Sequence, residues 1–219
     1  MLLEHLPALA KTKIVLASAS PRRHELLQLL GLKPEVIPSK FEENLSKDLF
    51  SKAAEYAVAT AKGKALDVTQ LLATQGKAVD LIIGADTIVE HDSEILEKPA
   101  NADDAARMLG KLSGNKHLVH TGMVLVVPSS NPGVEGPLMS SASVTTAVQF
   151  DELSNDTISA YIASGHPFGK AGSYGIQGPA ATFVKHIDGD FFNVMGFPLN
   201  AFANEVSDLI AAGHLKLMS

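Results

Sequence analysis

The sequence predicts an α/β domain with a mixed sheet, and two observations carry that prediction. Residues 13–18 form a short apolar run, KIVLAS, and a segment with helical spacing follows directly at 21–32, which is the strand–helix order of α/β proteins. Residues 116–127 and 141–150 are both rich in β-forming residues and flank a polar Gly/Pro/Ser stretch, which indicates a long hairpin. A strand–helix start followed by later hairpins favours an α/β fold with a mixed sheet.

The first helix is bounded by its own end signals. Ser20 is a suitable N-cap, Pro21 fits the first helical turn, and Gly31 fits the C-terminal stop. A second strand is predicted within 33–39, KPEVIPS. The first two predicted strands therefore lie on either side of one helix.

The middle of the chain alternates helices and strands. Residues 51–75 are alanine-rich and helical, with a weak point at Gly63. Buried strands are expected at 79–83 and 87–90, so that GAD lies at a strand junction. Acids follow Asn101, which is the pattern of a capped helix over 101–114.

The remaining elements complete one domain over residues 1–219. We predict a flexible hairpin tip at about 128–140, a helix over 154–165, a hairpin turning at Asp188-Gly189, and a closing helix at about 198–212. No repeat and no convincing linker divides the chain.

Composition narrows the class of protein. The chain has 219 residues, no cysteine and a net charge of −6, so disulfides and thiolate metal sites are excluded and a basic nucleic-acid-binding face is not expected. It has no apolar run of the length that crosses a membrane and no signal-peptide pattern. We expect a soluble, cytoplasmic protein that binds neither nucleic acid nor membrane.

The stretch SASPRR is the first candidate site. Ser18 and Ser20 precede a helix N-terminus, which attracts anions, while Arg22 and Arg23 place two cations on that same positive end. A phosphate shared by amides and guanidinium groups would resolve this conflict. The alternative is an ordinary pair of surface arginines.

Two further motifs carry possible chemistry. Asp86 follows an apolar run in LIIGADTIV, where it could act as a base or face a metal, or could be a turn residue. Five glycines punctuate 165–178, which fails the Walker pattern because Ala171 follows Lys170. The loop could bring backbone close to a ligand, with Gln177 reading a base edge, or could be a series of turns.

Weaker candidates are scattered along the chain. Glu42 and Glu43 could supply oxygen ligands to Mg²⁺, and Lys98 could contact a phosphate, although each could equally be solvated. His117 and His120, three apart on a predicted strand, make a poor metal pair. The residues alone indicate an enzyme or binder for a small phosphorylated ligand.

Several blocks in the same order resemble the Maf family of nucleotide pyrophosphatases. They are LASASPRRHELL, GADTIV, LEKPANADDAARMLGKLSG, YIASGHPFGKAGSYGIQG and VMGFPL, and they span about residues 13–210. The resemblance implies an elongated, two-lobed mixed sheet with flanking helices and a central cleft, similar to the inosine triphosphate pyrophosphatases. It also implies hydrolysis of nucleoside triphosphates to the monophosphate and pyrophosphate, aided by Mg²⁺ or Mn²⁺.

The resemblance also implies roles for individual residues. Asp86 would be the catalytic residue, and Glu43 and Asp86 would hold the metal. The substrate-binding set would be Ser18, Ser20, Arg22, Arg23, Lys64, Thr87, Lys98 and Gln177, with Lys64 preferred to Lys62. Arg22, Thr87 and Gln177 resemble the specificity set of the branch that acts on dTTP and UTP.

Two functions remain open at this stage. The first is a dTTP/UTP pyrophosphatase, with modified pyrimidine nucleotides as further candidates. The second is a nucleotide-binding regulator of septation that works without turnover. Family resemblance also raises the expectation of a homodimer.

Overall fold

The computed structural model describes residues 2–128 and 136–217. The strands are β1 (Ile14–Leu16), β2 (Glu35–Val36), β3 (Leu81–His91), β4 (Glu94–Leu96), β5 (Lys116–Val127), β6 (Leu138–Phe150) and β7 (Val184–Asp188). The α-helices are α1 (Leu6–Leu9), α2 (Pro21–Leu29), α3 (Ala53–Thr74), α4 (Ala102–Leu112), α5 (Asn155–Ala163), α6 (Phe191–Met195) and α7 (Leu199–Ala211). Short 3₁₀ turns occupy Leu2–His5, Lys47–Leu49, Ala171–Ser173 and Pro179–Phe183.

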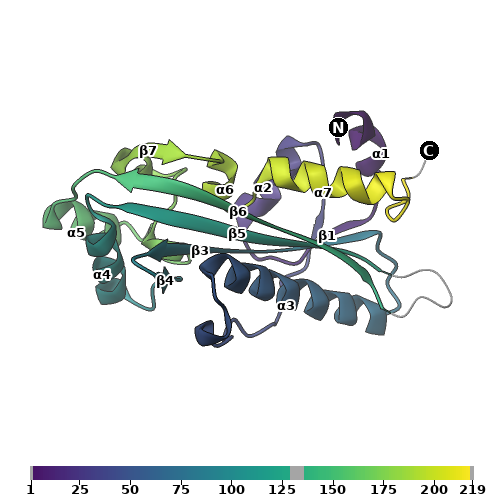
Figure 1. Ribbon diagram of the computed structural model, residues 1–219, viewed down its shortest axis with the longest axis horizontal. Coiled ribbons are helices and arrows are strands. Elements are labelled where there is room, and N and C mark those ends of the chain that lie inside the picture. Colours follow the sequence, from purple (N-terminus) through teal and green to yellow (C-terminus); the bar gives the residue numbers. More distant parts are fainter. Residues whose placement is uncertain (1, 129–135, 218–219) are drawn as a thin grey trace.

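The strands form one sheet of mixed direction, as the sequence predicts. Their order is β2-β1-β3-β5-β6-β7, with β4 added beside β3. β1 pairs in parallel with β2 and β3, whereas all other pairs are antiparallel. The molecule is elongated along β5 and β6, with α4 and α5 at one end and both termini toward the other (Figure 1).

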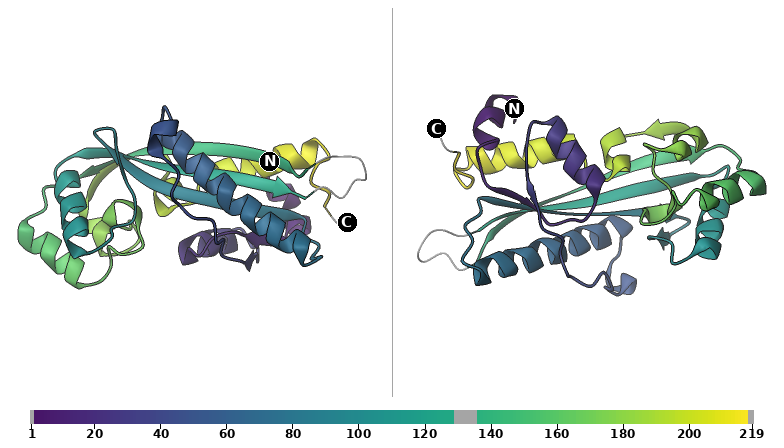
Figure 2. Two further views of the ribbon diagram at one scale, coloured as in Figure 1. Left: turned by 90° about the horizontal axis from the view of Figure 1, so that it is seen from below. Right: turned by 180° about the vertical axis from the view of Figure 1, so that it is seen from behind.

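Helices cover the two faces of the sheet. α3 runs along one face, and α2 and α7 lie on the other (Figures 1 and 2). Side chains of β3 alternate between these layers: Ile82 packs in the α3 cluster, whereas Leu81, Ile83 and Ala85 pack in the cluster of α2 and α7. A separate apolar cluster joins α4 and α5 at the far end, which gives the two-lobed form.

Two glycines bring α3 close to the sheet. A β-carbon at Gly84 would lie 2.4 Å from the Ala61 carbonyl oxygen, and one at Gly122 would lie 2.4 Å from the Ala57 carbonyl carbon. Any side chain at either position would push the helix outward. These glycines therefore set how far a side chain from α3 must reach to meet β3.

Three predictions of local structure were wrong. The strands expected at 79–83 and 87–90 are one continuous strand, β3, with GAD inside it. No hairpin turns at Asp188-Gly189, because Asp190 caps α6 by accepting a hydrogen bond from the Phe192 amide. Residues 138–140 of the expected tip belong to β6, while 129–135 lie outside the described residues.

The predicted N-cap residues of three helices are confirmed. Asn101 caps α4 and Ser154 caps α5 through side-chain hydrogen bonds, as expected. Ser20 is the N-cap residue of α2, although its side chain makes no capping hydrogen bond. No helix within the described ranges is both long and apolar enough to span a membrane.

Candidate active site

The candidate site adjoins an open stretch of strand edge. β1 pairs with Leu81–Ile83 and β4 pairs with Val89–His91 on the same side of β3. Within the described chain, no strand covers residues 84–88 on that side. A cavity of about 550 Å³ lies here, lined by the β1–α2 turn, by β3 and by the glycine-rich segment. This volume suits a small-molecule ligand.

Lys64 joins two carboxylates at this edge. Its Nζ lies 2.7 Å from Asp86 Oδ1 and 3.0 Å from Glu43 Oε1. The side chains of Lys64 and Asp86 are only 9% and 8% exposed, whereas that of Glu43 is 36% exposed. Of the two candidate lysines, Lys64 lines the cavity, whereas Lys62 is exposed and does not line it.

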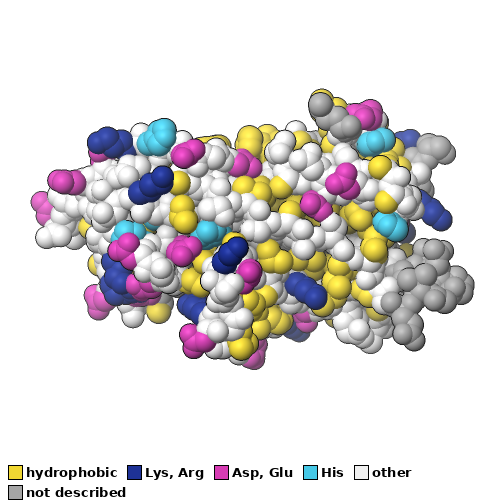
Figure 3. All heavy atoms as spheres, in the orientation of Figure 1, with side chains coloured by type: hydrophobic (Ala, Val, Ile, Leu, Met, Phe, Trp, Pro, Cys, Tyr) yellow, Lys and Arg dark blue, Asp and Glu magenta, His cyan; other side chains and the backbone are white. Residues whose placement is uncertain are grey.

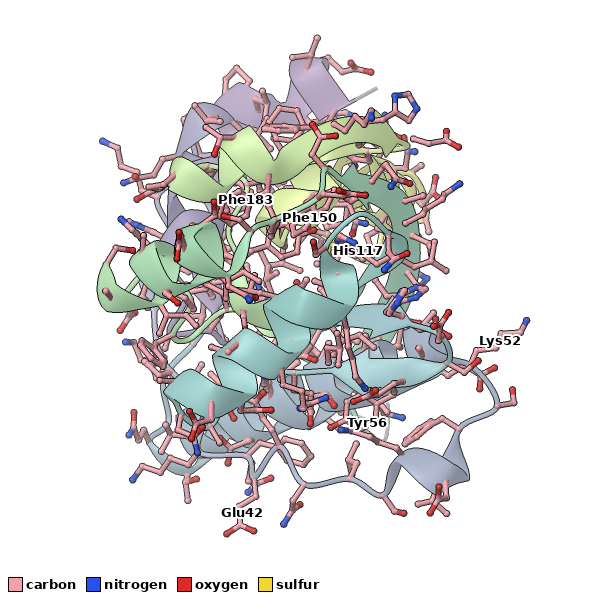
Figure 4. All side chains as sticks on the ribbon, turned by 90° about the vertical axis from the view of Figure 1, so that its left-hand side faces the viewer. Glu42, Lys52, Tyr56, His117, Phe150 and Phe183 are labelled. Carbon is pink, nitrogen blue, oxygen red and sulfur yellow. The ribbon has the colours of Figure 1, made fainter. Side chains whose placement is uncertain are left out.

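Glu43 reaches the site because its loop is fastened to α3. The Phe41 ring packs directly on Gly63, where a β-carbon would lie 2.4 Å from the ring. Ser39 donates a hydrogen bond to Asp67 on the same helix. Gly63, which the sequence predicts to weaken helix α3, is therefore the position at which this loop packs on the helix. Glu42 bonds only Asn44 among the described residues and projects outward (Figure 4).

Electrostatics keeps Glu43 ionised. Burial alone would raise its pKa, but the charges and hydrogen bonds of Lys64 and Lys98 outweigh burial and hold the pKa of Glu43 below its usual value. Lys98 Nζ lies 3.3 Å from both Glu43 oxygens and is itself exposed. A carboxylate beside two ammonium groups results.

The two arginines of SASPRR differ in their surroundings. Arg23 is 8% exposed and donates hydrogen bonds to Ser18 Oγ, Ala85 O, Gly196 O and Thr87 Oγ1. Arg22 is half-buried, makes no hydrogen bond or ion pair with another described residue, and lines the cavity. Burial lowers the pKa of both guanidinium groups but leaves them charged.

The turn before α2 supplies hydroxyl groups. Ser18 is buried and its Oγ accepts from the Ser20 amide as well as from Arg23. Both serines line the cavity. Hydrogen bonds to Ser18 Oγ therefore hold the turn in shape, and Ser20 is the more accessible of the two serines.

The glycine-rich segment forms the opposite wall of the cavity. Gly172 and Ser173 adopt positive φ, and Gly175 leaves room for Lys170 and Arg22, whose nearest atoms would lie 2.8 and 3.1 Å from a β-carbon there. Gln177 is exposed and lines the cavity. The structure thus brings every predicted site residue to this one cavity.

Behind that wall lies a buried aromatic cluster. Tyr174 lines the cavity, and its hydroxyl lies 2.8 Å from His117 Nε2. Phe150 packs edge-on against both rings, and Figure 4 shows it with His117 and Phe183 in the interior of this end of the molecule. Burial lowers the pKa of His117 to about 3, so this ring is neutral at ordinary pH.

Lys170 and Gly196 are among the cavity residues that sequence reasoning did not assign to the site. Lys170 lines it beside Arg22, and burial together with the charge of Arg22 lowers the pKa of Lys170. Gly196 lines it too, in a left-handed conformation with φ of 107°. The signals were present, since Lys170 lies in the glycine-rich segment and Gly196 in the VMGFPL block.

Glu43 and Asp86 are the candidate metal ligands of the cavity. Among residues 2–128 and 136–217, no three His, Asp or Glu side chains gather as a metal-binding group. Glu43 and Asp86 do converge on one point, the Lys64 ammonium. Mg²⁺ is commonly bound by one or two carboxylates together with substrate phosphates and water, so this pair fits a metal that arrives with a phosphorylated substrate.

The face shown in Figure 3 carries basic and acidic side chains interspersed rather than gathered by sign. The cavity instead collects Arg22, Arg23, Lys64, Lys98 and Lys170 against Glu43 and Asp86. The local excess of positive charge favours an anionic ligand.

The chain is similar in sequence to known proteins of one family. The family model described as Maf-like protein matches residues 13–209. Over 90% of its length the chain is 47% identical to a human protein named probable bifunctional dTTP/UTP pyrophosphatase/methyltransferase protein, of which the match covers 32%. It is 45% identical to a dTTP/UTP pyrophosphatase of Ruminiclostridium cellulolyticum over 90% of this chain and 95% of that protein.

A third relative is also named as a pyrophosphatase. The chain is 44% identical to a nucleoside triphosphate pyrophosphatase of Dictyostelium discoideum, over 87% of this chain and 88% of that protein. The chain spans about a third of the human relative but most of the length of the other two. With the family model matched from Lys13 to Leu209, the protein belongs to the Maf family.

Proposed function

We propose that this protein is a hydrolase that cleaves dTTP and UTP to the nucleoside monophosphate and pyrophosphate. One observation carries the proposal: the buried Lys64–Asp86 pair, 2.7 Å apart, opens onto the same cavity as Arg22 and Gln177. Relatives of nearly the same length and 44–45% identity are named pyrophosphatases of these or of unspecified nucleoside triphosphates.

The cations of the cavity account for substrate binding. Arg22, Lys98 and Lys170 line the cavity. Each of them donates fewer hydrogen bonds to other described residues than Arg23, which donates four. A triphosphate carries several negative charges that these groups would neutralise. Positioning together with charge neutralisation supplies most of what such phosphoryl chemistry requires.

Asp86 is placed to activate water. Its Oδ1 accepts from Lys64, which fixes the carboxylate, while Oδ2 makes no hydrogen bond with a described residue. Oδ2 would take a proton from the attacking water. The water oxygen would bond to the α phosphorus while the bond from that phosphorus to the oxygen bridging the α and β phosphates breaks. Pyrophosphate then leaves, and the proton on Asp86 returns to solvent. General-base help of this kind contributes about 10²–10⁴-fold.

Glu43 and Asp86 are the residues that would hold Mg²⁺ or Mn²⁺. When bound, the ion would supply additional charge neutralisation for the phosphates. Through its contacts with both carboxylates, Lys64 would orient them toward the cavity before a ligand binds. Thr87 and Gln177, on the cavity wall with Arg22, would contact the base.

A nucleotide panel tests the proposal. dTTP, UTP, CTP, ATP and GTP would each be incubated with the protein and Mg²⁺ or Mn²⁺, and released pyrophosphate measured as phosphate after adding inorganic pyrophosphatase. We expect dTTP and UTP to be turned over fastest. Tight binding of nucleotides with no turnover of any of them would contradict the proposal and favour a binding protein.

A further inference from the structure

Phe168 presents an aromatic ring to the cavity that the protein itself leaves largely uncovered. The residue lines the cavity and is 42% exposed. Among the phenylalanines, only Phe41 and Phe168 contact no other aromatic ring of the described chain. Phe41 packs on Gly63 instead. Phe168 is therefore a large apolar side chain at the cavity without an aromatic neighbour.

The backbone around Phe168 is anchored, so its ring is not part of a loose end. The preceding residue, Pro167, is buried. Lys170 Nζ donates a hydrogen bond to the His166 carbonyl oxygen and so closes the turn around Phe168. Gly169 allows the chain to turn here, with a φ of 74° that favours glycine. Pro167 thus points inward while Phe168 is held out at the cavity.

The other aromatic residue that lines the cavity has little surface to offer. Tyr174 is 5% exposed, and its hydroxyl lies 2.8 Å from His117 Nε2. The rings of Phe150 and His117 pack edge-on against it, with centroids 4.8 and 5.4 Å away. Among the described residues, accessible aromatic surface in this cavity therefore comes from Phe168.

The turn that carries Phe168 adjoins the part of the cavity where the base would lie. Arg22, Gln177, His166 and Lys170 together line a smaller neighbouring cavity. Lys170 and Arg22 also approach each other at Gly175. Since Arg22 and Gln177 lie on the side proposed for the base, Phe168 is placed near the base.

The chemistry of a phenyl ring narrows what it can contact. It offers neither a charge nor a hydrogen-bond donor to a phosphate, whereas the face of a nucleobase stacks on aromatic side chains. We propose that Phe168 is a substrate-binding residue whose ring stacks on the base of the bound nucleotide. Every base has such a face, so the contact adds affinity without selecting among bases. The inference deepens the proposed function and rests on it, because it assumes that a nucleotide occupies the cavity.

Fluorescence tests the contact directly. The chain contains no tryptophan, so Phe168→Trp introduces a single reporter and keeps an aromatic ring. The probes are α,β-methylene-UTP, whose methylene bridge resists the proposed cleavage, and inorganic tripolyphosphate, which has no base. We expect the UTP analogue to quench the tryptophan and tripolyphosphate to leave its emission unchanged. Phe191→Trp, at a position that is 44% exposed and does not line the cavity, is the matched control and should respond to neither.

Steady-state kinetics provide a second readout. Phe168→Ala removes the ring and should raise KM for UTP at least about 5-fold, the low end for one base–aromatic stack, with a smaller effect on kcat. This division is expected when a contact is lost that binds substrate and transition state alike. Phe168→Tyr restores a ring and should recover most of the affinity, whereas Phe191→Ala should leave KM unchanged.

Two results would overturn the inference. One is a Phe168→Trp emission that the UTP analogue fails to quench, or that tripolyphosphate quenches equally. The other is a KM for UTP that is the same in Phe168→Ala as in Phe191→Ala. Pyrophosphate release from UTP by the wild-type protein is measured alongside. Release that continues in either case shows that the stacking contact is wrong while the proposed function stands.

Discussion

Lys64 of α3 donates a hydrogen bond from Nζ to Asp86 Oδ1 of β3 across 2.7 Å, and both side chains are nearly buried. The pair forms where Gly84 lets the helix approach the strand. Asp86 gains a fixed orientation from this contact, and Glu43 is drawn to the same ammonium. The chemistry of the site therefore depends on backbone packing as much as on the charged groups.

Asp86→Asn should abolish turnover while leaving nucleotide binding largely intact. The amide keeps the shape of the carboxylate and loses its ability to take a proton, so kcat for UTP should fall at least about 100-fold. Steady-state kinetics and equilibrium dialysis measure the two quantities. Asp103→Asn, at an exposed position in α4, is the matched control. A variant that kept most of its rate would show that Asp86 is not the base.

Lys64→Met should destabilise the fold by about 3–5 kcal/mol, because it leaves the buried Asp86 carboxylate without its cation. Lys62→Met changes an exposed lysine of the same helix and should alter the free energy of unfolding by less than about 0.5 kcal/mol. Urea unfolding of both variants at pH 7 gives the comparison. Equal stability of the two would contradict the structural role assigned to Lys64.

Gly84→Ala should lower both stability and activity. The added methyl group would lie 2.4 Å from the Ala61 carbonyl oxygen and 2.8 Å from Ala65 Cβ, so α3 must move, at a cost of about 1–3 kcal/mol. Gly110→Ala, in α4 with no neighbour within 4 Å of the new carbon, should instead gain up to about 1 kcal/mol. Thermal unfolding should separate the pair in opposite directions.

Acid should weaken the fold partly through His117. Burial lowers its pKa from 6.5 to about 3, so the unfolded chain binds a proton that the folded chain refuses. Stability from this residue is complete above pH 6.5 and is lost progressively between pH 6.5 and 3, by about 2 kcal/mol at pH 5. His117→Gln should reduce that loss between pH 7 and pH 5 in urea unfolding, whereas exposed His214→Gln should leave it unchanged.

The residues that sequence reasoning singled out line one cavity in the structure, and they could be singled out because they lie next to local signals. Ser18 and Arg22 flank a helix start, and Gln177 lies among glycines, so each could be singled out without knowing the fold. The direction of the sheet also followed from the order of strand, helix and hairpin. The resemblance to the Maf family then joined these separate signals into one site.

Long-range packing accounts for what sequence reasoning missed. The sequence predicts a strand junction at Gly84, yet Gly84 lies inside β3, where α3 packs against it. The sequence also predicts a hairpin turn at Asp188-Gly189, but Asp190 caps helix α6 there instead. The difference between Arg22 and Arg23 depends on Ala85 and Gly196, which are distant in sequence, so no local pattern could reveal it.

The most direct test of the account is the identity of the products from UTP, followed by ³¹P NMR with wild-type protein and Mg²⁺. The account predicts UMP and pyrophosphate in equal amounts, with no UDP and no phosphate, and with both signals absent in Asp86→Asn. Release of UDP and phosphate, or UMP formation that persists in Asp86→Asn, would contradict it.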